Sequence, residues 1–310
     1  MHMNLEQLRG FITIAEVGHF THAAELLHLT QPSLSRQIST LEQELGSELF
    51  HRARGNISLT AAGQALLPRA RRMLADEETI RSEMADLAGL RRGRVRLGAP
   101  PTLCVSLVSE VLEIYRENYP GVQLQIFEAG SHRLLEQLAG GELDLALIVT
   151  SEHAVNEKNL QNLPLLEEQL VVIDSLERPH LAEATCLALK DLAPIAQLAF
   201  SHSYDLRAST AQAYKASGLV PNIVVEGGEM DAVLRFVHRG LGVAVVPATV
   251  ALETPGIRAI ALRDPQLVRT IGLAHRRDVS LTRAASAMHG LIENTAKLLS
   301  ARHEQITSLF

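Results

Sequence analysis

The sequence is poor in aromatic residues and in cysteine, and it has no long apolar run. Its 310 residues include no tryptophan, four tyrosines and seven phenylalanines, so any core must be built mainly from aliphatic side chains. The two cysteines, Cys104 and Cys186, are too few for a disulfide framework. No run of about 18 apolar residues occurs, which argues against a membrane-spanning helix. The N-terminus lacks the basic and apolar regions of a secretion signal, so we expect a cytoplasmic protein with no membrane partner.

The chain also lacks an excess of basic charge. Its formal net charge is −6, which disfavours broad attraction to nucleic acid. Residues 1–100 contain 12 arginines, no lysine and 11 acidic residues, whereas residues 101–310 contain 17 basic and 24 acidic residues. Any affinity of the N-terminal part for DNA must therefore come from the local placement of arginines and from dimerisation.

Residues 23–52 have the pattern of two short helices joined by a tight turn. Thr30 is a good N-cap for the second helix, and Pro32 suits its first turn, where a missing N–H costs little. Apolar residues at spacings of four, three and four predict one buried stripe, formed by Leu34, Ile38, Leu41 and Leu45. The opposite face carries short polar side chains and a guanidinium, at Gln31, Ser33, Ser35, Arg36 and Ser39. Such a face suits the base edges and phosphates of a DNA major groove, so we interpret the segment as a helix-turn-helix that reads DNA.

The same segment carries a family resemblance. The residues LRGFITIAEVGHFTHAAELLHLTQPSLSRQISTLEQELGSELFHR, followed by LTAAGQALL, resemble the N-terminal region of LysR-type transcriptional regulators. In the rest of the chain, local phrases such as GELDLALIV and VHRGLGVAVVP match closely. The resemblance implies an N-terminal winged helix-turn-helix, a long linker helix, and a C-terminal two-lobed α/β domain resembling type 2 periplasmic binding proteins. It also implies a homo-oligomer, usually a tetramer built as a dimer of dimers.

The exposed helix face and the resemblance together predict which residues contact DNA. Arg36 and Arg52 occupy family-matched positions, and Arg54 lies beside a Gly55-Asn56 turn that fits a two-stranded wing. An exposed arginine is often only solvated, and that is the alternative for each of them. The expected partner is double-stranded DNA with an inverted repeat, contacted by Thr30, Gln31, Pro32, Ser33, Ser35, Arg36, Arg52 and Arg54. RNA polymerase is a candidate further partner.

A second long helical segment follows the wing and continues to about residue 91. Positions 59 to 87 step by four and three and are mostly apolar, which is a heptad pattern interrupted at Gly63 and Glu77. About thirty residues of helix would span ~45 Å, which is more than a small domain can cover. The alternative is a surface helix packed on its own domain. We predict a dimerisation seam formed by Leu66, Ala70, Met73, Ile80, Met84 and Leu87.

Beyond this helix, short apolar runs typical of strands alternate with helical segments. The alternation predicts an α/β domain with mostly parallel sheets, in which one strand begins at Leu170. Together with the resemblance it gives three domains: a winged helix-turn-helix at 1–60, a linker and dimerisation helix at 61–91, and an effector-binding domain at 92–310. Lobe I would comprise about 93–163 and 268–303, and lobe II about 164–267.

Four strand-to-helix junctions in this domain offer backbone N–H groups beside small polar side chains. In open α/β sheets, ligands bind beyond the strand C-termini, and helix N-termini attract anions, so a small carboxylate is the expected ligand. The alternative is that Thr102, Ser131 and Ser201 are merely N-caps. Because the family's effector cleft lies at these junctions, the resemblance implies an effector site formed by Pro101, Thr102, Ser131, Ser201, His202 and Met230.

Two other functions are compatible with an α/β domain. His202 and Asp205 resemble a fragment of a catalytic constellation, but no positioned nucleophile accompanies them, so we do not expect an enzyme. Cys104 begins a helix, where a thiol pKa can fall, which would suit a redox sensor. Its separation from Cys186 does not match a close sensing pair, and a plain buried cysteine is favoured.

No metal or cofactor is expected. Three histidines, His19, His22 and His28, lie close together in the sequence, but no cysteine or carboxylate pattern completes a metal site. The sequence is most typical of a sequence-specific transcriptional regulator that is controlled by a small, anionic metabolite.

Overall fold

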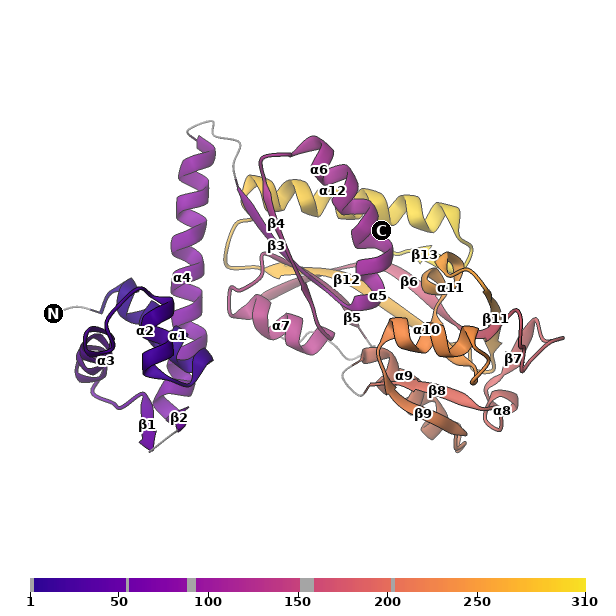
Figure 1. The fold of residues 1–310 in the computed structure, drawn as a ribbon. Coiled ribbons are helices and arrows are strands. Elements are labelled where there is room, and N and C mark those ends of the chain that lie inside the picture. Colours follow the sequence, from indigo (N-terminus) through magenta and orange to yellow (C-terminus); the bar gives the residue numbers. More distant parts are fainter. Residues whose placement is uncertain (1–2, 54–55, 88–92, 151–158, 202–203) are drawn as a thin grey trace. The chain divides into compact units, whose positions relative to one another are not determined.

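The structure is a computed structural model that describes residues 3–53, 56–87, 93–150, 159–201 and 204–310 (Figure 1). The chain divides into two compact units: residues 1–90 form the body of the first, and most of residues 91–310 form the second. Among the described residues, no helix is both long enough and apolar enough to cross a membrane.

The first unit is a winged helix-turn-helix followed by a long helix. Its elements in chain order are α1 (Leu5–Val17), α2 (Phe20–Leu26), α3 (Gln31–Leu45), β1 (Phe50–Ala53), β2 (Asn56–Leu59) and α4 (Ala61–Leu87). A capping box starts α1, since Asn4 and Gln7 bond reciprocally through side chain and backbone at 2.9 Å. The strands β1 and β2 pair antiparallel, with His51 opposite Ser58, and form the predicted wing.

The core of the first unit is mainly aliphatic, with a pair of phenylalanines at its centre. Phe11 of α1 and Phe50 of β1 lie 5.3 Å apart between ring centroids. The predicted stripe of α3 is buried at Leu34, Ile38 and Leu41, but the prediction for Leu45 is wrong, because its side chain is 41% exposed. Leu45 is the last residue of α3 before the left-handed C-cap Gly46, so it lies past the end of the core.

The early part of α4 packs inside its own unit, which removes Ala70 from the predicted dimerisation seam. Ala70 is fully buried and Leu66 is partly buried in the core of this unit. Both interruptions of the heptad pattern, at Gly63 and Glu77, occur where α4 contacts another part of its own unit. A Cβ on Gly63 would lie 2.2 Å from the Leu49 carbonyl oxygen, and Glu77 pairs with Arg9 of α1 at 3.3 Å.

The exposed residues of the predicted seam lie further along α4. Met73, Ile80 and Met84 are 41%, 59% and 55% exposed. Leu87 ends α4, and its side chain lies outside the described residues. Met73 is therefore the first of the predicted seam residues whose side chain is exposed.

The second unit is a two-lobed α/β domain, as predicted. Its strands are β3 (Arg94–Ala99), β4 (Gln123–Glu128), β5 (Leu145–Thr150), β6 (Leu160–Ser175), β7 (Cys186–Ala188), β8 (Gln197–Phe200), β9 (Ile223–Gly228), β10 (Ala244–Pro247), β11 (Ile257–Arg263), β12 (Val268–Arg276) and β13 (Ile306–Ser308). Its helices are α5 (Pro101–Leu103), the π-helical turn η1 (Cys104–Val108), α6 (Ser109–Asn118), α7 (Ser131–Ala139), α8 (Leu189–Leu192), α9 (Asp205–Ala216), α10 (Met230–His238), α11 (Ala248–Glu253) and α12 (Arg283–Arg302).

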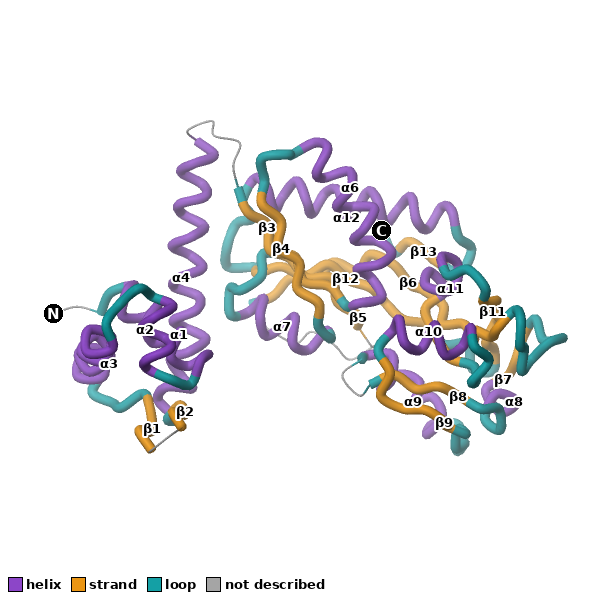
Figure 2. The backbone as a smooth tube through the Cα atoms, viewed as in Figure 1, coloured by secondary structure: helices purple, strands orange, loops and turns teal. Residues whose placement is uncertain are grey.

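One sheet runs through both lobes in the order β4-β3-β5-β12-β6-β11-β7, and β10 and β13 also pair with β6 (Figure 2). The prediction of mostly parallel sheets is wrong. Parallel pairing joins β3 to β4 and β5, β8 to β9 and β11 to β7, but β6 and β12 pair antiparallel with every described neighbour. These two long strands are the chain crossings between the lobes. The predicted strand at Leu170 begins ten residues earlier, at Leu160.

Each lobe has its own hydrophobic core, and the cores meet along β6. Lobe I is built around β3, β5, α6 and α12, and its core includes Leu166 of β6 and Ile306 of β13. Lobe II is built around β8, β10, β11 and α10, and its core begins at Leu170. Figure 1 shows α6 and α12 on one side of the lobe I strands and α7 on the other. The change of core between Leu166 and Leu170 places the residues between them at the junction of the lobes.

Candidate functional site

The first candidate site is the exposed face of α3. The Thr30 side chain accepts the Ser33 backbone N–H at 3.4 Å as N-cap, and Pro32 lies in the first turn, as predicted. His28 has a φ of 54°, which makes the tight turn before the helix. Gln31, Pro32, Ser33 and Arg36 are exposed, and Ser35 is half-buried. No acidic residue lies in the first turn of α3, so its positive end is free to face phosphates.

The wing arginines are only partly described. Arg52 lies on β1 opposite Ile57 of β2, and its side chain lies outside the described residues. Arg54 also lies outside them. Their predicted contacts with DNA therefore stay predictions.

The second candidate site lies at the junction of the lobes, where Thr102 joins a buried network. Thr102 is 2% exposed, and its hydroxyl accepts Arg269 Nη1 at 2.8 Å. Thr102 lies inside α5, whose N-cap is Pro100 and whose first residue is Pro101, so the alternative that Thr102 is an N-cap is wrong. Because its oxygen accepts a hydrogen bond from Arg269, Thr102 keeps its own proton to donate.

The network continues to a buried ion pair that the sequence analysis missed. Arg269 Nε donates to Glu168 Oε2 at 2.8 Å, and Nη2 lies 2.7 Å from the same oxygen. Glu168 Oε1 accepts the backbone N–H and hydroxyl of Thr249, at the N-terminus of α11, at 2.8 and 2.7 Å. The carboxylate is thus held by a guanidinium, a hydroxyl and a helix N-terminus. This combination makes burial of its charge tolerable.

A second carboxylate lies at the N-terminus of α7. Ser131 is 6% exposed, and its backbone N–H and hydroxyl donate to Asp205 Oδ2 at 3.1 and 2.6 Å. The Ser131 oxygen also accepts the Val149 N–H at 2.8 Å. Its hydroxyl is therefore engaged with Asp205 of lobe II and with Val149 of β5, rather than capping its own helix. Neighbouring His132 is 90% exposed and lies in solvent.

Ser201 and Met230, two further predicted effector residues, lie around the start of α10. The Ser201 N–H donates to the Gly228 carbonyl at 3.3 Å, and the Met230 N–H donates to the Tyr204 hydroxyl at 3.4 Å. Met230 is 5% exposed, so its side chain belongs to the lobe II core. Burial and a 2.6 Å hydrogen bond to Glu229 raise the pKa of Tyr204 to about 12. His202 lies outside the described residues.

Cys104 is half-buried against the lobe I core, rather than fully buried as expected, and its surroundings keep the thiol neutral. Burial raises the pKa of the Cys104 thiol to about 12, and the nearby Glu128 carboxylate contributes to that rise. Its Sγ lies 3.8 Å from the Ala99 carbonyl oxygen as a weak donor. Because the thiolate is the reactive species, these surroundings oppose a redox role for Cys104.

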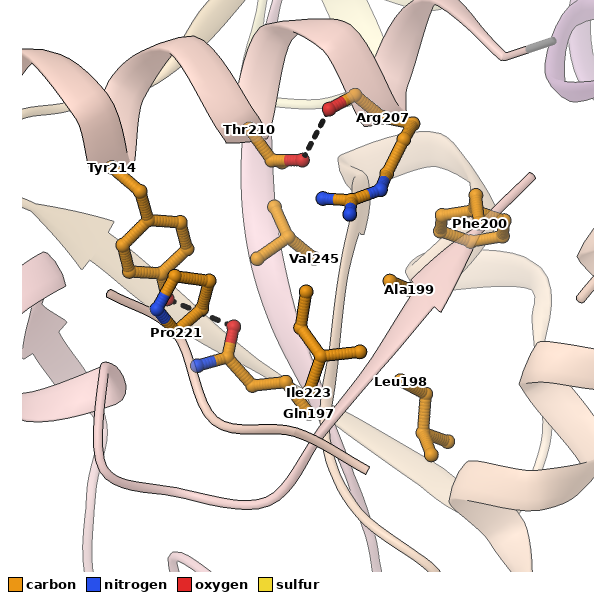
Figure 3. Close-up of a pocket in the computed structure, with 10 residues that line it drawn as sticks. All are labelled: Gln197, Leu198, Ala199, Phe200, Arg207, Thr210, Tyr214, Pro221, Ile223 and Val245. Atoms are coloured by element: carbon orange, nitrogen blue, oxygen red, sulfur yellow. Dashed lines mark hydrogen bonds between the residues drawn. The ribbon is translucent and has the colours of Figure 1, made fainter. Parts of the chain in front are cut away.

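Lobe II also contains a cavity of about 30 Å³ between α9 and the strands β8 and β9 (Figure 3). Its lining comprises Gln197, Leu198, Ala199, Phe200, Arg207, Thr210, Tyr214, Pro221, Ile223 and Val245. Figure 3 shows the Arg207 guanidinium extending into it and Tyr214 donating to Gln197, a bond of 2.8 Å. This volume suits about two water molecules rather than a metabolite.

The comparisons with known proteins agree with this architecture. Residues 5–64 match the family described as "Bacterial regulatory helix-turn-helix protein, lysR family", and residues 88–297 match the "LysR substrate binding domain". The chain is 33% identical over 272 residues to an uncharacterized HTH-type transcriptional regulator, YybE of Bacillus subtilis, covering 88% of this chain and 92% of that protein.

Two solved structures illustrate the fold. A full-length OxyR variant from Pseudomonas aeruginosa superposes with a TM-score of 0.71 at 26% identity, covering 99% of this chain and 98% of that one. Full-length CbnR in complex with its target DNA superposes with a TM-score of 0.67 at 22% identity, covering 94% and 100% of the two chains. At that identity the likeness to CbnR shows the fold alone.

Proposed function

Since the chain belongs to the LysR family of DNA-binding transcriptional regulators with an effector-binding domain, we propose that a small carboxylate metabolite bound between lobes I and II controls it. The observation that carries the proposal is the pair of donors on Ser131. Its backbone N–H and hydroxyl converge on one carboxylate oxygen of Asp205, at 3.1 and 2.6 Å. The start of α7 can therefore hold a carboxylate, as helix N-termini commonly do.

Thr102 supports the same ligand class from the neighbouring junction. Its hydroxyl accepts from Arg269 and so presents its proton as a donor. The Arg269 charge behind it is balanced by Glu168, so a ligand meets hydrogen-bond donors rather than a bare cation. Such a site selects a ligand by its acceptor groups.

On the DNA side, we propose that α3 reads an inverted repeat. Its exposed face carries Gln31, Ser33 and Arg36 above a buried stripe that fixes the helix. Two such helices are needed for two half-sites. The exposed apolar residues Met73, Ile80 and Met84 of α4 would pair two chains, and two pairs would form the tetramer. Effector binding would then change the relative populations of oligomer shapes.

Thermal stability of the full chain tests the ligand class without knowledge of the metabolite. A ligand that binds only the folded form at 100 times its Kd adds about 2.7 kcal/mol, so a panel of small carboxylates should contain stabilisers. The affinity of the best stabiliser is then measured for Ser131→Ala and for a control, Ser109→Ala on α6. We expect weaker binding only for Ser131→Ala. Equal affinity in both variants would remove the site from the start of α7.

A further inference from the structure

The Asp205 carboxylate directly joins the two lobes. Asp205 is the first residue of α9, and the next residue, Leu206, lies in the lobe II core. Its Oδ2 accepts both donors of Ser131, the first residue of α7. Ser131 is anchored to lobe I, because its hydroxyl oxygen accepts the N–H of Val149 on β5 at 2.8 Å. Two hydrogen bonds to one carboxylate therefore span the junction.

These bonds use both hydrogen-bond donors of Ser131. Its backbone supplies one N–H and its hydroxyl supplies one proton, and both are directed at Asp205. A second carboxylate at this position would have no donors from Ser131 until Asp205 leaves. The chain's own carboxylate thus occupies the place where the proposed function puts the carboxylate of the effector.

The surroundings stabilise the Asp205 charge through helix ends. Asp205 lies in the first turn of its own helix, α9, and contacts the first backbone N–H of α7. The positive ends of two helices, one from each lobe, therefore converge on one carboxylate. This arrangement stabilises the state in which the lobes are joined, and it favours a negatively charged group between the two helix ends.

Resting on the proposed function, we propose that Asp205 is an internal competitor of the effector. It latches the lobes through Ser131 until an anionic ligand displaces it. The latch raises the apparent Kd for any such ligand, which equals the intrinsic Kd divided by the fraction of unlatched chains. Asp205 is thereby a specificity-determining residue, because only a ligand that supplies an equivalent acceptor to both Ser131 donors can replace it.

Hydrogen–deuterium exchange of the full-length protein tests the latch without any metabolite. Asp205→Ala removes the carboxylate, and Asp205→Asn keeps its shape but removes its charge. Asp231→Ala is the matched control, since Asp231 is an exposed acid in the first turn of α10. We expect exchange in the peptide covering the first turn of α7 to be at least ~10-fold faster in Asp205→Ala, a change of about 1.4 kcal/mol, with Asp205→Asn between it and the wild type. Exchange as slow as in Asp231→Ala would overturn the latch.

Sodium formate, which replaces the deleted carboxylate, tests the competition. In Asp205→Ala, formate should restore slow exchange at the start of α7, whereas sodium chloride at equal ionic strength should not. In the wild-type protein, a change in exchange at the start of α7 should need at least ~10-fold more formate, because Asp205 competes for the same donors. If formate acts no better than chloride, this position does not select carboxylates and the competition is wrong. Neither readout uses DNA or a metabolite, so an unsuccessful effector screen would count against the proposed function alone.

Discussion

Arg269 and Glu168 form an ion pair at the junction of the lobes, with Nη2 2.7 Å from Oε2 and side chains only 6% and 1% exposed. Glu168 lies on β6, between the core of lobe I and that of lobe II, and it also accepts two hydrogen bonds from Thr249 of α11. Arg269 extends the network to Thr102 of α5. The pair therefore connects the predicted effector residue Thr102 with both lobes.

Removal of one partner of this pair should strongly destabilise the protein. Glu168→Ala leaves the Arg269 charge buried, so we expect the free energy of unfolding to fall by ~3–5 kcal/mol. Glu167→Ala is the control, since Glu167 is half-buried on the same strand. Denaturant unfolding at one fixed protein concentration measures both variants. A loss no larger for Glu168→Ala than for Glu167→Ala would show that the pair carries little stability.

The missed ion pair shows where sequence analysis fell short. Leu166, Glu168 and Leu170 alternate as buried residues along β6, so a strand predicted from residue 160 would have placed Glu168 inward. Glu167 and Glu168 interrupt the apolar pattern of this segment, so its uninterrupted apolar run begins only at Leu170. A charge paired with a distant residue, here Arg269, gives no local signal in the sequence.

The helix-turn-helix was predictable because its determinants are local. The cap at Thr30, the turn at His28 and the buried stripe from Leu34 to Leu41 all act within one short segment. The exposed residues of α4 were harder to predict from the sequence. An apolar periodicity shows that a helix face is covered, but it does not show whether the same chain or a second chain covers it. Ala70 packs against its own unit, whereas Ile80 is exposed.

Arg36 should contribute to sequence-specific DNA binding. If its guanidinium contacts a base edge, Arg36→Ala should cost ~1–3 kcal/mol on operator DNA and relax sequence preference. Arg69→Ala, an exposed arginine on α4, is the control. Fluorescence anisotropy on operator and random duplex separates the possibilities. Equal losses on both duplexes for Arg36→Ala would assign Arg36 to phosphate contact.

Ile80 should be essential for self-association through α4. Its side chain is 59% exposed in the single chain, so Ile80→Asp costs little there but would bury a charge in a paired seam. We expect sedimentation velocity to show smaller species for Ile80→Asp at micromolar concentration. Val220→Asp, at an apolar position that is 86% exposed in lobe II, should sediment like the wild type. Unchanged sedimentation of Ile80→Asp would place the dimer interface elsewhere.

Cys104 should be unreactive at neutral pH. Its pKa is raised to about 12 from 9.0, mainly by burial, so folding favours the neutral thiol. The stability associated with burying the neutral thiol is fully present below pH 9 and is lost as the pH rises towards 12. Peptide mass spectrometry after iodoacetamide treatment at about pH 8 should show alkylation of the exposed Cys186 well before Cys104. Faster labelling of Cys104 than of Cys186 would instead support a role for Cys104 as a redox sensor.

The most direct test of effector control is the coupling between ligand and operator DNA. An operator is first selected from genomic fragments with the full-length protein, and its Kd is measured by anisotropy with and without the best carboxylate stabiliser. Coupling of about 1–3 kcal/mol corresponds to roughly 5- to 150-fold in affinity, and linkage requires operator DNA to change the affinity for the carboxylate by the same factor. We predict such a reciprocal change, or an altered footprint on the operator, with no change on random duplex. An operator affinity and footprint that both stay unchanged at saturating carboxylate would contradict the account.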